Sequence, residues 1–149
     1  MRLSEAFGLQ ACVIHLDGDT PFIDLVEHPL RRLKTACSSR QVPLVRASLW
    51  AAHRIMDAGS TLAFPKYCSD DKCNANSASA ALNKWLKPRV PDGCVMHSFR
   101  HSLCDRLLAI ECSSEIIDAI AGWTTEGVGH QYGKGHSLKV TYGWMRRLC

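Results

Sequence analysis

The chain has 149 residues, of which 46% are hydrophobic, and this is enough for one compact domain with an apolar core. Its formal net charge of +4 suits a phosphate-rich partner without identifying one. We expect this single domain to span residues 1–149. No apolar run approaches the length of a bilayer-spanning helix and no signal peptide opens the chain, so we predict a cytoplasmic protein with no membrane partner.

The first third of the chain carries the pattern of a short helix followed by a small sheet. Apolar residues at helical spacing over residues 2–9 predict a helix that ends near Gly8. Short apolar runs at residues 13–16, 22–26 and 41–45 predict three strands, the first two joined by the turn-forming residues 17–19. We therefore expect a small three-stranded antiparallel sheet.

The rest of the chain follows a helical period. Ser113 is the expected N-cap of the helix over residues 114–120. The last helix, over residues 137–148, carries an apolar stripe that would cover either this domain or a neighbouring subunit. The fold class is thus α+β, mainly helical with the sheet at one edge. The predicted helices span residues 49–56, 78–86, 99–108, 114–120 and 137–148.

Eight cysteines raise the question of disulfides or zinc. Because no export signal and no regular cysteine spacing is present, we expect free thiols. Cys68 and Cys73 form one loose pair, whereas a structural zinc site normally needs two close pairs. No bound metal is expected, and a zinc-dependent interaction domain is the last-ranked hypothesis.

The most informative stretch is His97–His101, with the sequence His-Ser-Phe-Arg-His, followed by Gly122-Trp123 and then by Tyr132. Each of these residues alone has an ordinary structural explanation, but their joint order and spacing do not. The stretch resembles the tyrosine recombinase (phage integrase) family, in which an HxxRH box precedes a Gly-His or Gly-Trp pair. The nucleophilic tyrosine of that family follows nine positions after the His or Trp, as Tyr132 follows Trp123.

The resemblance extends to the front of the chain. Residues 1–5, Met-Arg-Leu-Ser-Glu, are similar to the first box of the family, GxRxSE, and Arg2 matches its arginine. Residues 34–44 reproduce the pattern KTxxSxRxVPL, in which Lys34 matches the lysine of a β-hairpin. The resemblance therefore covers nearly the whole chain and implies a recombinase catalytic domain.

The resemblance implies cleavage and rejoining of DNA through a 3′-phosphotyrosyl bond, with no cofactor. Metal-free phosphoryl transfer needs planar guanidinium groups on the non-bridging oxygens, which Arg2 and Arg100 would supply. Tyr132 is the expected nucleophile, His97 its proton acceptor and Lys34 the acid that protonates the leaving 5′-oxygen. Trp123 stands where many relatives have histidine; its indole can donate a hydrogen bond but cannot carry a proton. His101 and Glu5 are expected to support these groups.

The expected partner is double-stranded DNA, on which the family implies a tetramer. Cations between the second and third strands, and one after the tyrosine, are expected to contact DNA phosphates, although a solvated turn is the ordinary alternative. Complete family members also have an N-terminal core-binding domain and further helices before the first arginine, which this chain lacks, so we expect weak DNA binding by the isolated chain. The expected phosphate contacts are Arg31, Arg32, Arg40 and Lys134.

Two other functions stay open at this point. A type IB topoisomerase-like nicking and closing activity has the same active-site plan, and only a substrate with two sites separates it from recombination. A non-catalytic module for DNA binding or assembly is the alternative from another class; DNA that stays intact while binding is retained would favour it.

Overall fold

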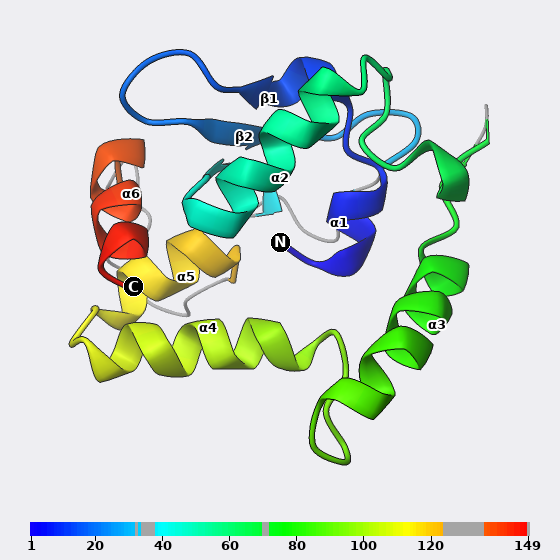
Figure 1. Ribbon diagram of the computed structural model, residues 1–149. Helices are drawn as coiled ribbons and strands as arrows, with labels where there is room; N and C mark the ends of the chain where they lie inside the picture. Colours follow the sequence, from blue (N-terminus) through cyan, green and yellow to red (C-terminus); the bar gives the residue numbers. More distant parts are fainter. Residues whose placement is uncertain (32, 34–37, 70–71, 124–135, 149) are drawn as a thin grey trace.

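The structure is a computed structural model that describes residues 1–31, 33, 38–69, 72–123 and 136–148. It contains a small sheet and helices arranged around the N-terminus, which lies near the middle of the molecule (Figure 1). The helices are α1 (Leu3–Phe7), α2 (Arg46–Asp57), α3 (Ala75–Leu86), α4 (Ser98–Ala109), α5 (Ser114–Ala121) and α6 (Leu138–Arg147), with short 3-10 turns η1 (Ala11–Val13), η3 (Pro65–Tyr67) and η4 (Lys87–Arg89). The strands are β1 (Ile14–His15), β2 (Phe22–Leu25) and β3 (Arg40–Pro43).

The three strands form one antiparallel sheet in the order β1-β2-β3. Ile23 in the middle strand pairs with Ile14 on one side and with Val42 on the other. These apolar side chains, together with Leu44 and Ala52, form a first core between the sheet and α2. The predicted α+β class, mainly helical with a three-stranded antiparallel sheet, is confirmed.

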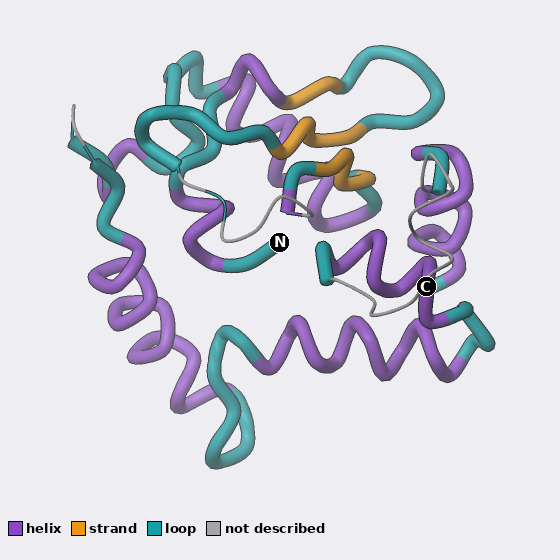
Figure 2. Tube along the Cα trace, turned by 180° about the vertical axis from the view of Figure 1, so that it is seen from behind, coloured by secondary structure: helices purple, strands orange, loops and turns teal. Residues whose placement is uncertain are grey.

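A second core lies among α4, α5 and α6. Its buried members include Leu107 on α4 and Ile117 and Ile120 on α5, and the half-buried Trp144 and Met145 of α6 pack against it. The apolar stripe predicted for the last helix therefore covers this domain itself, as the position of α6 beside α5 also shows (Figure 2). The described residues contain no helix long and apolar enough to cross a membrane.

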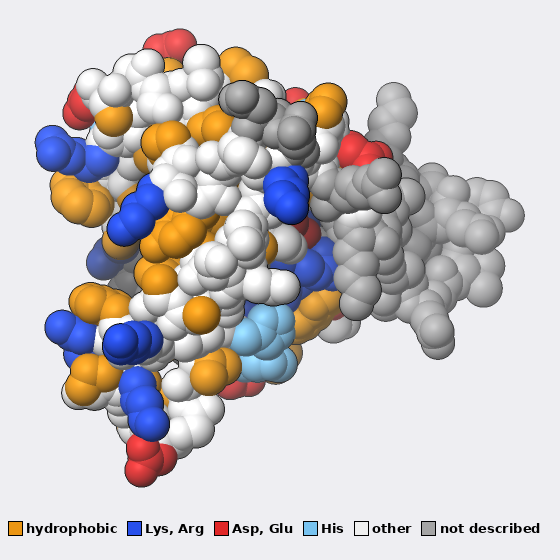
Figure 3. Space-filling model, turned by 90° about the vertical axis from the view of Figure 1, so that its right-hand side faces the viewer, with side chains coloured by type: hydrophobic (Ala, Val, Ile, Leu, Met, Phe, Trp, Pro, Cys, Tyr) orange, Lys and Arg blue, Asp and Glu red, His pale blue; other side chains and the backbone are white. Residues whose placement is uncertain are grey.

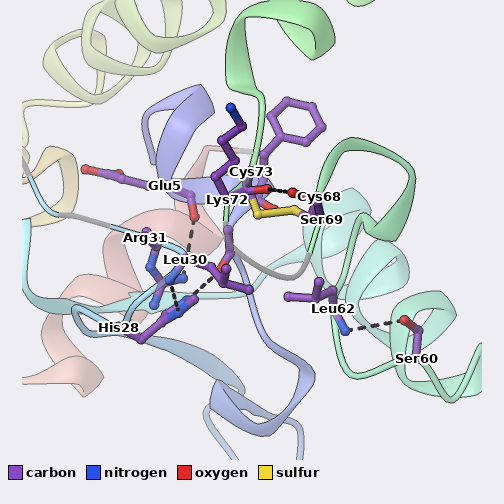
Figure 4. Close-up of a disulfide and its surroundings, with 12 residues drawn as sticks. Glu5, His28, Leu30, Arg31, Ser60, Leu62, Cys68, Ser69, Lys72 and Cys73 are labelled. Atoms are coloured by element: carbon purple, nitrogen blue, oxygen red, sulfur yellow. Dashed lines mark hydrogen bonds between the residues drawn. A yellow bond between two sulfur atoms is a disulfide. The ribbon is translucent and has the colours of Figure 1, made fainter.

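The cysteines give a correction. We expected free thiols, but Cys68 and Cys73 form a disulfide. The backbone at Cys68 pairs antiparallel with that at Cys73, and the Ser69 N–H donates to the Lys72 carbonyl at 2.8 Å, so two cysteines that are five positions apart face each other (Figure 4). The spacing of these two cysteines did not predict that their thiols would meet.

The disulfide lies beside the segment that holds α1 in place. Arg31 is 2% exposed. Its guanidinium donates to the Glu5 carbonyl (Figure 4). It also donates to the Val26 carbonyl. Arg31 thus ties the segment after β2 to α1. We expected Arg31 to contact DNA phosphate, but its side chain lies in the interior. All three guanidinium nitrogens donate to backbone carbonyls inside the protein rather than facing solvent.

Candidate active site

The end of α5 is the point on which the arginines of the site converge. Arg40 Nε donates to the Ile120 carbonyl at 3.2 Å, Arg100 Nη2 to the Ala121 carbonyl at 2.5 Å and Arg2 Nη2 to the Gly122 carbonyl at 3.3 Å. The last carbonyls of a helix have no partner within the helix and carry the negative end of its dipole, so cations are stabilised there. Three consecutive carbonyls thus fix three arginines that lie far apart in the sequence.

Glu5 is the carboxylate at the centre of this cluster, and it is 2% exposed. It accepts hydrogen bonds from the Arg2 backbone N–H at 2.6 Å and from Arg2 Nη1 at 2.8 Å. Its other ion pair is with Arg40 Nη2 at 3.2 Å. A buried carboxylate is stable only when it is paired in this way, and here the pairing orients the Arg2 fork.

Ser38 completes the support of the two arginines, and it is fully buried. Its hydroxyl accepts from Arg2 Nη1 at 3.0 Å, and its carbonyl accepts from Arg40 Nη1 at 2.7 Å. Ser38 was not among the residues predicted for the site, although Ser38 and Arg40 are both fixed positions of the pattern in residues 34–44. The sequence pattern therefore contained the signal from which the supporting role of Ser38 and Arg40 could have been predicted.

Arg40, like Arg31, is placed differently from our expectation of a phosphate contact. Its side chain is 8% exposed, and its fork is held by Ser38, Ile120 and Glu5. A guanidinium engaged on three sides within the protein acts as a brace between β3 and α5. We assign Arg40 that positioning role and not contact with DNA.

Arg100 comes from the first turn of α4 and is 8% exposed. Within the described residues it makes a single hydrogen bond, to the Ala121 carbonyl, whereas a guanidinium carries five N–H donors. The ring of Trp123 lies against it, with 4.9 Å from Cζ to the ring centroid. Trp123 itself is 37% exposed, which leaves its indole accessible from solvent.

The charges of the site are unbalanced in favour of anions. Burial lowers the pKa of the Arg100 guanidinium from its ordinary value, and the positive charges of Arg2 and Arg40 lower it further while Glu5 opposes them. An arginine nevertheless stays protonated at neutral pH. Among the described residues of the site, three guanidinium groups face one carboxylate, and the resulting excess of positive charge favours an anion such as a phosphodiester.

His97 stands immediately before α4, one turn from Arg100 and on the same segment. Its carbonyl accepts from the Arg100 backbone N–H at 3.0 Å, and its ring contacts that of His101. Both histidines are exposed. The HxxRH spacing thus gives a buried arginine beside an exposed imidazole.

Four of the predicted site residues lie outside the described residues: Lys34, Tyr132, Arg32 and Lys134. Their roles stay predictions. Among the described residues, no three side chains of His, Cys, Asp or Glu are grouped so that they could hold a metal ion.

Gly122 is required by this architecture for two reasons. It ends α5 in the left-handed conformation at φ 67°, and a Cβ on it would lie 2.5 Å from Arg40 Nη1. Because three hydrogen bonds hold that guanidinium, it cannot yield without loss. We expect Gly122→Ala to lower the free energy of unfolding by about 1–3 kcal/mol more than the left-handed conformation alone costs, as measured by urea denaturation.

The matched control for that substitution is Gly59→Ala. Gly59 has nearly the same φ, 65°, but a Cβ there meets no atom within 4 Å. It therefore reports the conformational cost alone, about 1–2 kcal/mol. Equal losses for the two variants would show that Arg40 does not pack on Gly122.

The protonation of Glu5 gives this network a pH dependence. Burial by itself would raise the pKa of the Glu5 carboxyl, but the Arg2 backbone N–H, the charge of Arg40 and hydrogen bonds from both side chains outweigh it, and the pKa lies below its ordinary 4.5. A lowered pKa in the folded state stabilises the protein above the unfolded-state value, and this stability is lost as the pH falls through the folded-state value.

We therefore expect the melting temperature of the wild-type protein to fall more steeply below pH 4.5 than that of Glu5→Gln. The variant is less stable at neutral pH, and the two curves of melting temperature against pH converge in acid because only the wild type loses a charged network there. Thermal unfolding followed by circular dichroism over a pH series measures this. Parallel curves would mean that Glu5 does not couple to Arg2 and Arg40.

Comparison with known proteins identifies the family of the chain. The chain matches the model of the phage integrase family over residues 1–134, which includes the arginines, the HxxRH box and the tyrosine. No curated protein sequence and no solved structure gives a significant match. Because the family model covers most of the chain, the protein is a member of the phage integrase family.

Proposed function

We propose that the chain is a tyrosine recombinase catalytic domain that cleaves and rejoins double-stranded DNA through a covalent bond to Tyr132. Site-specific recombination is the function of the phage integrase family as a whole. The observation that carries the proposal is the convergence of Arg2 and Arg100 on adjacent carbonyls at the end of α5. Two guanidinium groups fixed side by side suit the two non-bridging oxygens of one phosphodiester.

Each step of the proposed reaction has a residue to perform it. The Tyr132 hydroxyl loses its proton to His97 and attacks the phosphorus, and the bond from phosphorus to the 5′-oxygen breaks. Lys34 protonates the departing oxygen, and the indole N–H of Trp123 donates to a phosphate oxygen. Attack by a free 5′-hydroxyl reverses these steps, so the strand is resealed without an energy source.

The positive field of the site supports the nucleophile as well as the phosphate. A phenol is largely protonated at neutral pH, and neighbouring guanidinium groups favour its anion. Arg2 and Arg100 are kept in place by protein contacts on Glu5, Ser38 and the α5 carbonyls, so little reorganisation is needed when charge develops on the phosphate. The ordinary roles of Glu5 and Arg40 are thus those of positioning residues.

The test is a nicked duplex that loses a short fragment when it is cleaved, which traps the covalent complex. We expect a protein–DNA adduct on a denaturing gel, with peptide mapping to Tyr132 and with a loss of at least about a thousandfold in Tyr132→Phe. Tyr142→Phe, on α6, is the matched control and should retain the adduct. An adduct that persists in Tyr132→Phe, or that maps to another residue, would contradict the proposal.

Self-association into a tetramer on DNA is part of the proposal and separates recombination from simple nicking and closing. A substrate with two sites should yield exchanged strands in the first case. In the second case a supercoiled plasmid with one site would relax, but no strands would be exchanged between two duplexes.

A further inference from the structure

His97 and His101 form a pair of accessible imidazoles at the start of α4. His97 has helical backbone angles, φ −68° and ψ −24°, so the helical spiral runs through both residues and places them one turn apart on the same face. Their ring centroids are 5.0 Å apart with an interplanar angle of 75°. Both are exposed, and histidine side chains form one patch on the face seen in Figure 3.

Two histidines in this arrangement are a chelating pair for a transition-metal ion. Imidazole nitrogen is the commonest protein ligand for such ions, and histidines four positions apart on a helix can bind one ion together. Metal–nitrogen bonds of about 2.0–2.1 Å require the two ligating nitrogens to lie about 3–3.5 Å apart in a tetrahedral site. Ring centroids 5.0 Å apart are compatible with this separation after rotation of the side chains.

We propose that His97 and His101 bind one divalent transition-metal ion, with its remaining coordination positions taken by water. The ion accepts a nitrogen lone pair from each neutral ring and displaces bound water. While it is bound, His97 has no lone pair with which to accept a proton, so DNA cleavage would be reversibly inhibited. That last consequence rests on the proposed function, whereas the binding itself does not.

The surroundings of the pair set its affinity. Arg100 lies on the same turn, but its guanidinium is directed to the Ala121 carbonyl and is covered by Trp123. Its charge nevertheless weakens cation binding, while the exposed Asp105, one turn beyond His101, favours it. We expect moderate affinity in the order Cu²⁺ above Ni²⁺ and Zn²⁺, with no measurable binding of Mg²⁺ or Ca²⁺.

Other described histidines have different neighbours. Both ring nitrogens of His28 take part in hydrogen bonds, to the Gly8 carbonyl and the Leu30 N–H, and His15 is stacked on Phe22. His53 is exposed on α2, with leucine and aspartate four positions to either side. His53 is therefore the matched control, an accessible histidine without a second imidazole on its face.

The experiment is isothermal titration of the full chain with Ni²⁺ and with Zn²⁺. The wild type and His53→Ala should bind one ion per chain, and His97→Ala and His101→Ala should each bind on the order of tenfold more weakly or worse, since even the loss of a residue that only supports a ligand costs that much. Because both side chains are exposed, neither substitution should change the urea midpoint. Absence of saturable binding, or equal binding by the double variant, would overturn the proposal.

Two further measurements distinguish histidine ligands from cysteine ligands, and failure of metal binding from failure of DNA cleavage. The Co²⁺ complex should lack the charge-transfer absorption of a thiolate, because Cys94, exposed before α4, is not a ligand in this proposal; a thiolate band would overturn it. In the cleavage assay, Zn²⁺ should suppress adduct formation and a chelator should restore it. If the chain forms no adduct at all, the proposed function fails while the titration still decides the metal site.

Discussion

Arg100→Lys is expected to slow formation of the covalent DNA complex by about a hundredfold or more, measured in single-turnover reactions at saturating protein. Lysine keeps the charge, but it loses the planar fork that can bond the Ala121 carbonyl and still present paired N–H groups to a phosphate. It also loses the flat cation against which Trp123 lies. The loss should appear in the rate of the chemical step, because DNA binding depends on many other contacts.

The matched control is Arg106→Lys on the same helix. Arg106 is exposed and bonds the Leu148 carbonyl, away from the end of α5. We expect its cleavage rate to stay close to that of the wild type. Urea denaturation of both variants shows whether the fold is retained. A folded Arg100→Lys protein with a cleavage rate within a few-fold of the wild type would show that Arg100 is not one of the two arginines that bind the phosphate.

Glu5→Ala is expected to lower the free energy of unfolding by about 3–5 kcal/mol, because it leaves the Arg40 charge buried without its counter-ion. The side chains of this pair are 3% and 8% exposed. The same substitution removes the carboxylate that orients Arg2, so any protein that remains folded should also cleave DNA more slowly. Chemical denaturation with a two-state fit measures the first effect.

The control for Glu5→Ala is Glu115→Ala at the start of α5. Its carboxylate is 65% exposed and lies 3.9 Å from His136, and an ion pair of this kind contributes about 0–1 kcal/mol. Similar losses for the two variants would mean that the buried network does not stabilise the fold. Glu5→Gln, which retains hydrogen-bonding capacity, should fall between them.

The elements of the fold were largely predictable from local patterns. All five helices expected after the sheet are present, because apolar residues at helical spacing bury one face whatever they pack against. The boundaries were less predictable: α2 begins three residues earlier than expected, at Arg46, which has a positive φ of 47°, and the Ser48 hydroxyl accepts from the Val45 N–H at that end of the helix. Ser113 is the N-cap of α5 by position, yet its side chain makes no capping bond.

The disulfide shows where local patterns fail. The five-residue separation of Cys68 and Cys73 is equally compatible with free thiols, and only the turn that brings Ser69 and Lys72 into contact makes the bond possible. The same holds for the last helix, whose apolar stripe fits either its own domain or a neighbour. Met145 and Leu148 of that stripe pack on the α5 core because the chain returns α6 to that face.

The sequence by itself determined the family and predicted the residues of the chemistry, because the order and spacing of Arg2, the HxxRH box, Trp123 and Tyr132 do not depend on coordinates. It did not determine which cations face DNA. Arg31, Arg40 and Arg100 are all arginines near a motif, yet only the tertiary structure separates two internal braces from one guanidinium that makes a single hydrogen bond within the described part of the chain. The physical reason is that the role of a charge depends on what surrounds it, and those surroundings are assembled from α1, β3, α4 and α5 only when the chain folds.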